Sequence, residues 1–192
     1  MNKQYKKPVR TGEKALTEAQ VDKLLSKVGR LDHEVLLRIA IELGLRRGDV
    51  VAIEQSNVNL ENRTLLFNEH KKGGAIHKVW LSESLSKLIE QYLYTLPSTK
   101  WLFPGVWNNG KNHMADKAAY NILAHYLKKA GLPPKPFHAL RATCVKIAQR
   151  HGWSIEEVMK LTNDTFRTIK EHYDTPSDEE MFETTTGKPL IE

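Results

Sequence analysis

The sequence predicts a mostly helical α+β fold with one small antiparallel β-sheet. Through most of the chain, apolar residues recur every three or four positions, which is the period of an amphipathic helix. Two short apolar segments, 64–67 and 78–81, flank a turn rich in lysine and glycine and predict a β-hairpin. With 192 residues, 40% of them hydrophobic, the chain is long enough for one substantial domain with its own core.

Capping signals place the first residues of two helices. Thr17 with Gln20 forms one capping box and Ser154 with Glu157 forms another, so a helix should follow each of them. A last short helix should carry Tyr173. The other predicted helices cover residues 33–43, 85–93, 115–129 and 137–150.

Composition and charge narrow the classes of function. The formal net charge is +6 and the isoelectric point is near 9.3, which favours a polyanionic partner. The single cysteine, Cys144, has no partner for an internal disulfide and suits a reducing cytosol. The sequence contains no apolar run of membrane-spanning length, no zinc-ligand spacing, no Walker loop and no dinucleotide-binding glycine pattern.

Five widely spaced residues carry the chemistry expected of phosphoryl transfer. In chain order they are Arg46, Lys72, His138, Arg141 and Tyr173. An arginine fork neutralises two phosphate oxygens, a lysine can protonate a leaving oxygen, and a tyrosine hydroxyl can attack phosphorus. Positions 138 and 141 share one face of a helix, so both side chains can reach one phosphate.

The order and spacing of these residues resemble the catalytic domain of tyrosine recombinases, the phage-integrase family. Arg46 lies in a segment similar to the family's Thr-Gly-Leu-Arg-x-x-Glu, and Asp49 takes the place of the acidic residue. His138 and Arg141 match His-x-x-Arg, which is the most specific local match. The resemblance covers residues 15–176, nearly the whole chain.

The hairpin lysine and the sixth site position are less firmly matched. Lys72 opens a segment similar to the family's Lys-Gly-x-x-x-Arg-x-Val-Pro-Leu, and Lys71 is the competing register. Members typically carry Leu-Gly-His, with the tyrosine about nine residues after that histidine. Here Asn163 matches the histidine by motif, and Asp164 matches it by its distance from Tyr173. We take Asn163 as the sixth residue, because an amide can donate to phosphate whereas an aspartate would repel it.

The resemblance implies a site-specific DNA recombinase that cleaves and rejoins DNA through a 3′-phosphotyrosyl intermediate, without metal or other cofactor. Tyr173 would attack the scissile phosphate, and Arg46 and Arg141 would clamp it. Lys72 would act as the general acid, and His138 would assist proton transfer at the tyrosine. Two alternatives stay open: a non-cleaving DNA-binding regulator on the same fold, and a DNA-relaxing enzyme like a type IB topoisomerase.

The sequence also predicts how the chain is organised. Residues 1–15 indicate a basic arm or linker, 16–176 the catalytic domain, and 177–192 a tail that would dock on a neighbouring protomer. By resemblance, the partner is double-stranded DNA and the assembly is a tetramer on paired sites, with a monomer in the absence of DNA. The expected location is the nucleoid-associated cytoplasm of a prokaryotic or virus-infected cell.

Typical members of the family carry a separate helical DNA-clamping domain before the catalytic one. About fifteen residues precede the first predicted helix of this sequence. The sequence therefore fits either a catalytic fragment of a longer integrase or a single-domain member like the fimbrial-switch recombinases.

Overall fold

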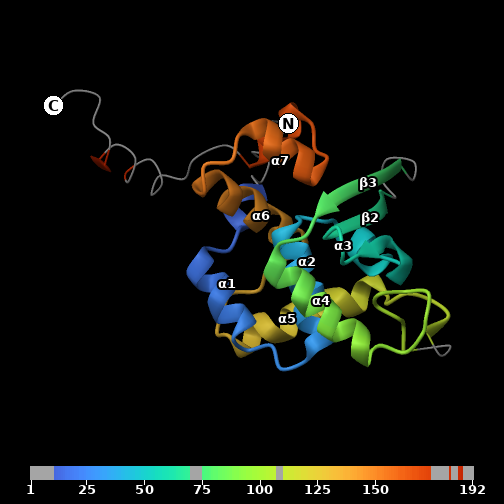
Figure 1. Cartoon of the computed structure of the whole chain (residues 1–192). Helices are drawn as coiled ribbons and strands as arrows, with labels where there is room; N and C mark the ends of the chain where they lie inside the picture. Colours follow the sequence, from blue (N-terminus) through green and yellow to red (C-terminus); the bar gives the residue numbers. More distant parts are fainter. Residues whose placement is uncertain (1–10, 70–74, 107–109, 174–181, 183–185, 188–192) are drawn as a thin grey trace, which may run out of the picture.

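The structure is a computed structural model that describes residues 11–69, 75–106, 110–173, 182 and 186–187. Within these residues, helices surround one central helix, and a three-stranded sheet lies at one side of them (Figure 1). The predicted mostly helical α+β class is confirmed. Within the same residues, no helix is both long and apolar enough to cross a bilayer.

The helices of the described part agree closely with the sequence signals. Both predicted capping boxes are present, at Thr17 before α1 and at Ser154 before α7. Two short 3-10 helices, η1 and η2, cover Thr11–Lys14 and Gln55–Asn57. The α-helices are α1 (Glu18–Leu25), α2 (Leu31–Glu42), α3 (Arg47–Val51), α4 (Glu83–Thr95), α5 (Asp116–Lys129), α6 (His138–Arg150), α7 (Ile155–Thr162) and α8 (Phe166–His172).

The sheet is antiparallel, with strand order β1-β2-β3. Its strands are β1 (Val58–Asn59), β2 (Thr64–Glu69) and β3 (Ala75–Trp80). The pairing of Glu69 with Ala75 continues the β2–β3 ladder to both edges of residues 70–74, which join the two strands in the chain. The predicted hairpin strands are therefore present, and both extend further toward that connection than expected.

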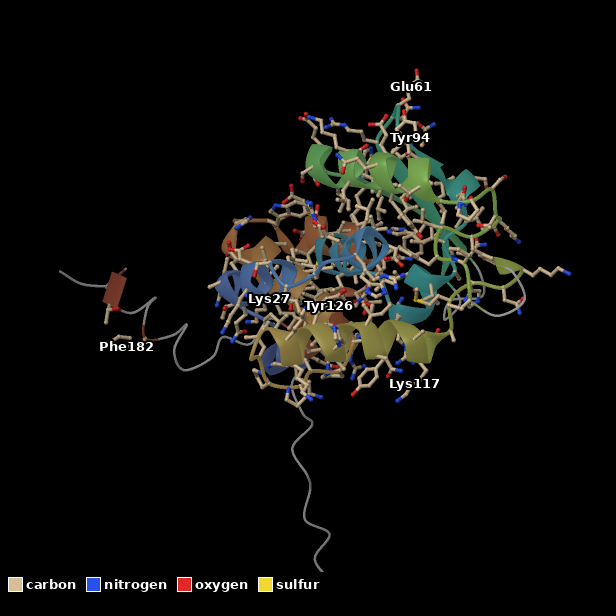
Figure 2. The ribbon with its side chains drawn as sticks, turned by 90° about the horizontal axis from the view of Figure 1, so that it is seen from below. Lys27, Glu61, Tyr94, Lys117, Tyr126 and Phe182 are labelled. Carbon is tan, nitrogen blue, oxygen red and sulfur yellow. The ribbon has the colours of Figure 1, made fainter. Side chains whose placement is uncertain are left out.

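Helix α2 forms the centre of the core. Its residues Val35, Leu36, Leu37 and Ile39 are completely buried, and the helix packs against α3, α4, α5 and α6 (Figure 1). These apolar residues fill positions 35–37 and 39, so they cover more of the helix surface than the single stripe of an amphipathic helix. The helices around it are amphipathic: in Figure 2, Lys117 projects from α5 into solvent, whereas Tyr126 of the same helix is 4% exposed.

A second, smaller apolar cluster joins α6, α7 and α8. It includes Val145, Val158, Ile169 and the side chain of Tyr173. Because this cluster is separate from the core around α2, the last three helices form a small unit seated on the main body. The site described below lies where this unit meets α3.

Two local features differ from the expectation. Residues 47–51 form helix α3, where the sequence shows only a short apolar run, because five residues are too few to display a helical period. Helix α8 ends at His172, and Tyr173 is its C-cap residue and does not lie within the helix.

Candidate active site

A glycine turn between α2 and α3 positions the first arginine. Gly44 has φ +62°, and a Cβ atom on it would lie 3.1 Å from Cys144 Sγ and 3.2 Å from Thr162 Cγ2. Both the backbone conformation and the close approach therefore require glycine. Arg46 follows as the N-cap residue of α3, with its side chain 22% exposed. Asp49 lies one turn further on and is buried.

The second arginine is buried deeply and held mainly by backbone oxygens. Arg141 lies in the first turn of α6 and is 2% exposed. Its Nη1 donates to Gly44 O at 2.5 Å, and its Nη2 donates to Thr162 O at 2.6 Å. The turn that ends α2 and the last residue of α7 thus meet at this guanidinium group. These contacts fix the arginine beside α3 although their residues are far apart in the sequence.

Asp164 joins the two arginines. Its Oδ1 atom lies 3.0 Å from Arg46 Nη2, and its Oδ2 atom lies 2.7 Å from Arg141 Nη2 and 3.1 Å from Arg141 Nε. The Asp164 side chain is 5% exposed. Asn163, the residue chosen from the sequence for the sixth position, is the C-cap of α7 and has left-handed backbone angles, φ 53° and ψ 32°.

The tyrosine hydroxyl lies against the histidine of the His-x-x-Arg motif. Tyr173 is 2% exposed, and its hydroxyl is 3.0 Å from Nε2 of His138, which is itself exposed at the start of α6. Burial raises the pKa of Tyr173, whereas the charges of Arg141 and Arg46 act in the opposite direction. A buried phenol with a histidine nitrogen at hydrogen-bond distance has a ready proton acceptor.

The predicted general acid lies outside the described residues. Lys72 and its competitor Lys71 belong to the segment 70–74. The structure does place His77 on β3, where its ring packs edge-on against Phe67 with centroids 5.3 Å apart. His77 Nε2 also lies 3.4 Å from Leu161 O, so the β2–β3 hairpin contacts α7, close to the arginines.

The structure thus brings together four of the predicted residues, Arg46, His138, Arg141 and Tyr173, from three separate parts of the chain. The contact of Asp164 with both arginines was not foreseen, although its distance from the tyrosine in sequence was a signal for that position. Within the described residues, no group of three or more His, Cys, Asp or Glu side chains could hold a metal ion.

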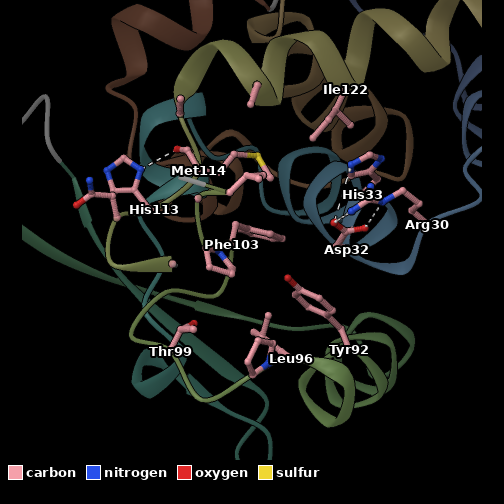
Figure 3. Close-up of a pocket in the computed structure, with 18 of the residues that line it drawn as sticks. Arg30, Asp32, His33, Tyr92, Leu96, Thr99, Phe103, His113, Met114 and Ile122 are labelled. Carbon is pink, nitrogen blue, oxygen red and sulfur yellow. Dashed lines mark hydrogen bonds and ion pairs between the residues drawn. The ribbon is translucent and has the colours of Figure 1, made fainter. Parts of the chain in front are cut away.

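A pocket of about 880 Å³ lies elsewhere in the molecule, between α2, α4 and α5 (Figure 3). Its walls include Leu96, Phe103, Met114 and Ile122, with Asp32 at one side. None of the predicted site residues that the structure describes lines this pocket. The lining of this pocket therefore does not connect it with the predicted phosphate chemistry, although the pocket is large.

Comparison with known proteins agrees with the resemblance to the phage-integrase family. The family model described as "Phage integrase family" matches residues 14–179. Tyrosine recombinase XerA of Pyrococcus horikoshii is 27% identical over 180 residues, which cover 93% of this chain and 62% of XerA. The chain therefore spans less than two thirds of the length of that relative.

Solved structures share the fold. The crystal structure of XerA recombinase superposes with a TM-score of 0.78 at 19% identity, covering 96% of this chain and 66% of that one. XerH site-specific recombinase, in a pre-cleavage complex bound to its difH substrate, gives a TM-score of 0.73 at 16% identity, covering 95% and 56%. Because the family model covers most of the chain and the fold agrees with these structures, the chain belongs to the phage integrase family.

Proposed function

We propose that the chain is the catalytic domain of a site-specific DNA recombinase that cleaves and rejoins DNA through a 3′-phosphotyrosyl intermediate. The observation that carries the proposal is the convergence of Tyr173 and His138 with two arginines in one site, where Tyr173 and Arg141 are buried and His138 is exposed. Outside such a site, a tyrosine hydroxyl is a weak nucleophile, and an adjacent base and a neutralised phosphate are what activate it.

The proton on the nucleophile has a path to solvent. Tyr173 Oη lies 3.0 Å from His138 Nε2, so His138 can accept the phenolic proton when its Nδ1 carries the ring hydrogen. His138 is exposed, and it can pass that proton on to water. Because burial raises the pKa of Tyr173, removal of the proton is the step for which the site must supply help.

The arginines supply the positive charge that phosphoryl transfer needs. Arg46 and Arg141 would bind the non-bridging oxygens of the scissile phosphate, whose negative charge grows in the transition state. Lys72 would protonate the leaving 5′-oxygen. The resulting covalent bond to Tyr173 retains the energy of the phosphodiester, so a 5′-hydroxyl from another strand can reverse the reaction without ATP or metal.

Double-stranded DNA is the proposed substrate. The net charge of +6 suits a polyanion, and two family structures contain DNA sites: XerH bound to difH, and a dimer of lambda integrase bound to a COC′ core site. We infer the same class of partner here, a tetramer on paired sites, a monomer without DNA, and a nucleoid-associated location in the cytoplasm of a prokaryotic or virus-infected cell. Asn163, the predicted sixth residue, would contribute through its left-handed backbone, which turns the chain from α7 toward Asp164.

The tail stays a prediction from the sequence. Most of residues 177–192 lie outside the described residues, and Phe182, which is described, is 69% exposed (Figure 2). We propose that its apolar residues dock on a neighbouring protomer when several copies share one DNA, since tethering on the same DNA raises their effective concentration. The basic arm 1–15 and the catalytic domain 16–176 complete the proposed organisation.

A covalent-attachment assay tests the function. Binding sites are first selected from random-sequence duplexes, and the selected site is then offered with a nick that prevents religation. We expect a protein–DNA adduct that resists denaturant, forms in the presence of EDTA, and is linked to the 3′-phosphate side of the break. Exchange of strands between two sites would distinguish a recombinase from a relaxing enzyme. Binding without any adduct would reject the proposal.

One observation favours a second candidate, a DNA-binding regulator that does not cleave. The Asp164 carboxylate lies between the two arginines and neutralises the charge that a phosphate would use. On this reading the same assay gives specific binding and no adduct. The choice between the two functions depends on whether Asp164 can leave that position.

A further inference from the structure

The Asp164 carboxylate occupies the position that the arginines would offer to a phosphate. One oxygen accepts a hydrogen bond from Arg46 at 3.0 Å; the other accepts one from Arg141 Nε at 3.1 Å and lies 2.7 Å from Arg141 Nη2 as an ion pair. Convergent guanidinium groups bind carboxylate and phosphate oxygens with the same fork geometry. The clamp proposed for DNA is therefore filled by a side chain of the protein itself.

The donors of Arg141 leave little for a second anion. A guanidinium group has five N–H bonds. Arg141 donates one to Gly44 O, one to Thr162 O and one, from Nε, to Asp164, and its Nη2 atom also forms the 2.7 Å ion pair with Asp164. Because all three nitrogens are engaged in this way, Arg141 cannot offer a two-pronged fork to a substrate phosphate until the carboxylate moves away.

The same contacts show that Arg141 does not depend on Asp164 for its position. Its two terminal nitrogens donate to the carbonyl oxygens of Gly44 and Thr162, which lie in two segments far apart in the sequence, and the side chain is 2% exposed. If the carboxylate left, the guanidinium would keep its place but lose its countercharge. A buried cation without an anion is strongly unfavourable, so some anion should occupy the clamp at all times.

Asp164 is also placed where it can leave. It lies in the short connection between α7 and α8, preceded by Asn163 in the left-handed conformation and followed by Thr165, the N-cap of α8. Left-handed backbone is the region that glycine favours, and glycine precedes histidine in the family's Leu-Gly-His. With Asn163 in the place of that glycine, Asp164 falls in the place of the histidine. Helix α8 ends at His172 and Tyr173 follows as its C-cap, so this connection also sets the position of the proposed nucleophile.

We propose that Asp164 stands in for the scissile phosphate while DNA is absent, and that an incoming phosphate displaces it from the two arginines. The identification of that phosphate with DNA rests on the proposed function. The exchange of anions itself concerns only this chain and can be measured without DNA. It makes the aspartate at this position compatible with cleavage, because the carboxylate withdraws when the substrate binds.

Inorganic phosphate is the probe for the exchange. The full chain and its Asp164→Asn variant are titrated with sodium phosphate against sodium chloride of equal ionic strength, and binding is followed by calorimetry and by the melting temperature. We expect the variant to bind phosphate about tenfold more tightly or better, because the internal competitor has lost its charge. The double variant Arg46→Gln with Asp164→Asn should lose this gain, which would place the bound phosphate at the clamp.

Asp32→Asn is the matched control. Arg30 holds Asp32 with the same two nitrogens, Nε and Nη2, at 3.1 and 2.7 Å, but each contacts a different oxygen and the arginine is exposed (Figure 3). This control should leave phosphate affinity unchanged. Equal phosphate affinity in wild type and the Asp164→Asn variant would overturn the proposal, and so would a gain of the same size in the Asp32→Asn control.

A second measurement uses the unaltered chain, in case the variant fails to fold. Saturating phosphate should increase amide hydrogen exchange at residues 163–165, because displaced Asp164 no longer fixes the connection between the two helices. Unchanged exchange with phosphate bound would overturn the proposal. Anion exchange without any DNA adduct would instead reject only the recombinase function, and adducts without anion exchange would reject only the role of Asp164.

Discussion

Two corners of the molecule contain the same two pairs of side chains in different surroundings. At the first, the catalytic corner, Arg141 forks onto Asp164, and the Tyr173 hydroxyl lies 3.0 Å from a nitrogen of His138. Both members of the ion pair are almost completely buried, with side chains 2% and 5% exposed. The four residues come from α6, the α7–α8 connection and the end of α8.

At the second, the α2–α5 corner, Arg30 forks onto Asp32, and the Tyr126 hydroxyl lies 3.0 Å from Nδ1 of His33. Three of these residues lie within four consecutive positions of the chain, 30–33, and the arginine is 66% exposed (Figure 3). The charge of Arg30 is thus satisfied locally and screened by water. Among the described residues, Arg30 is the arginine paired with Asp32, and no second arginine is paired with the same carboxylate.

The comparison shows that an arginine, an aspartate, a histidine and a tyrosine do not by themselves form a phosphate-binding site. Such a site also requires that they converge from separate parts of the chain and that the ion pair is buried. A fork at the surface contributes about 0–1 kcal/mol and leaves its arginine free to rearrange. The same fork in the interior costs about 3–5 kcal/mol to break and forces the protein to keep an anion there. The catalytic corner therefore combines the proposed nucleophile with a buried ion pair, whereas the ion pair of the α2–α5 corner is partly exposed.

The largest expected difference between the corners concerns the two tyrosines. Tyr173→Phe should abolish covalent attachment and leave DNA binding nearly intact, because it removes only a hydroxyl. Tyr126→Phe breaks an equally short, equally buried bond to a histidine and should leave attachment unchanged. The readout is the adduct on a denaturing gel. Adducts formed by the Tyr173→Phe variant would sink the assignment of the nucleophile.

The proposed general acid, Lys72, has no matched residue in the α2–α5 corner that could serve as its control. Lys72→Ala should slow cleavage by about 10²–10⁴, the usual contribution of general acid–base catalysis. A substrate with sulfur at the 5′-bridging position should restore the rate, because sulfur leaves without protonation. If that substrate rescues Lys71→Ala and fails to rescue Lys72→Ala, the register of the hairpin lysine is wrong.

The arginine forks give the next difference. Arg141→Lys and Arg46→Lys keep the charge but replace a planar fork by a point cation, so each should slow cleavage by about 10²–10³. Arg30→Lys makes the same change at the α2–α5 corner and should leave cleavage unaffected. Single-turnover rates with the nicked substrate provide the measurement. Near-normal rates for both clamp variants would refute the phosphate clamp.

Much of this arrangement was predictable from the sequence, because its signals are local. The capping boxes at Thr17 and Ser154 fix where two helices begin, and the three-residue spacing of His138 and Arg141 puts them on one helical face. The order of Arg46, His138 and Arg141 before Tyr173 predicted that these four side chains would lie together, whereas Lys72 lies outside the described residues and stays a prediction.

The remainder depends on tertiary contacts that no spacing reveals. Asp164 is as polar as any loop aspartate, and only the folded chain shows that two arginines converge on it. The sequence left undecided whether Asn163 or Asp164 fills the sixth position, and the left-handed backbone of Asn163 is a conformation that no spacing predicts. The α2–α5 corner was not foreseen for a similar reason. Asp32 and His33 are neighbours in the sequence, but Tyr126, which contacts His33, lies 93 positions away from it.

The two ion pairs should also differ in stability. Asp164→Asn should lower the free energy of unfolding by about 3–5 kcal/mol, because it leaves a buried guanidinium without a countercharge. Asp32→Asn should lower it by at most about 1 kcal/mol. Urea unfolding of both variants supplies the values. Phosphate should restore part of the loss in the first variant and none in the second, and equal losses in both would contradict the contrast in burial.

The smallest effect separates the corners by pH. Burial lowers the pKa of His33 below its ordinary 6.5, with Asp32 opposing the shift. Between this lowered pKa and the ordinary value of 6.5, the folded protein holds fewer protons than the unfolded chain. The free energy of unfolding therefore falls as the pH drops below about 6.5. Burial raises the pKa of Tyr173 above its ordinary 10.0. Here the folded protein keeps a proton that the unfolded chain loses, so stability falls as the pH rises above about 10.

Melting temperatures across the pH range should therefore show one loss on the acid side from the α2–α5 corner and one on the alkaline side from the catalytic corner. His33→Gln should flatten the acid side alone. Tyr173→Phe should reduce only the alkaline loss, and only in part, because burial also raises the pKa of Tyr92. Since the charge of Asp164 contributes to the raised pKa of Tyr173, Asp164→Asn should lower that pKa in the folded protein. The alkaline loss begins near the ordinary pKa of 10.0 in both proteins and ends at the folded pKa, so the loss should be smaller in the variant. An unchanged alkaline profile in that variant would show that the carboxylate and the nucleophile do not interact.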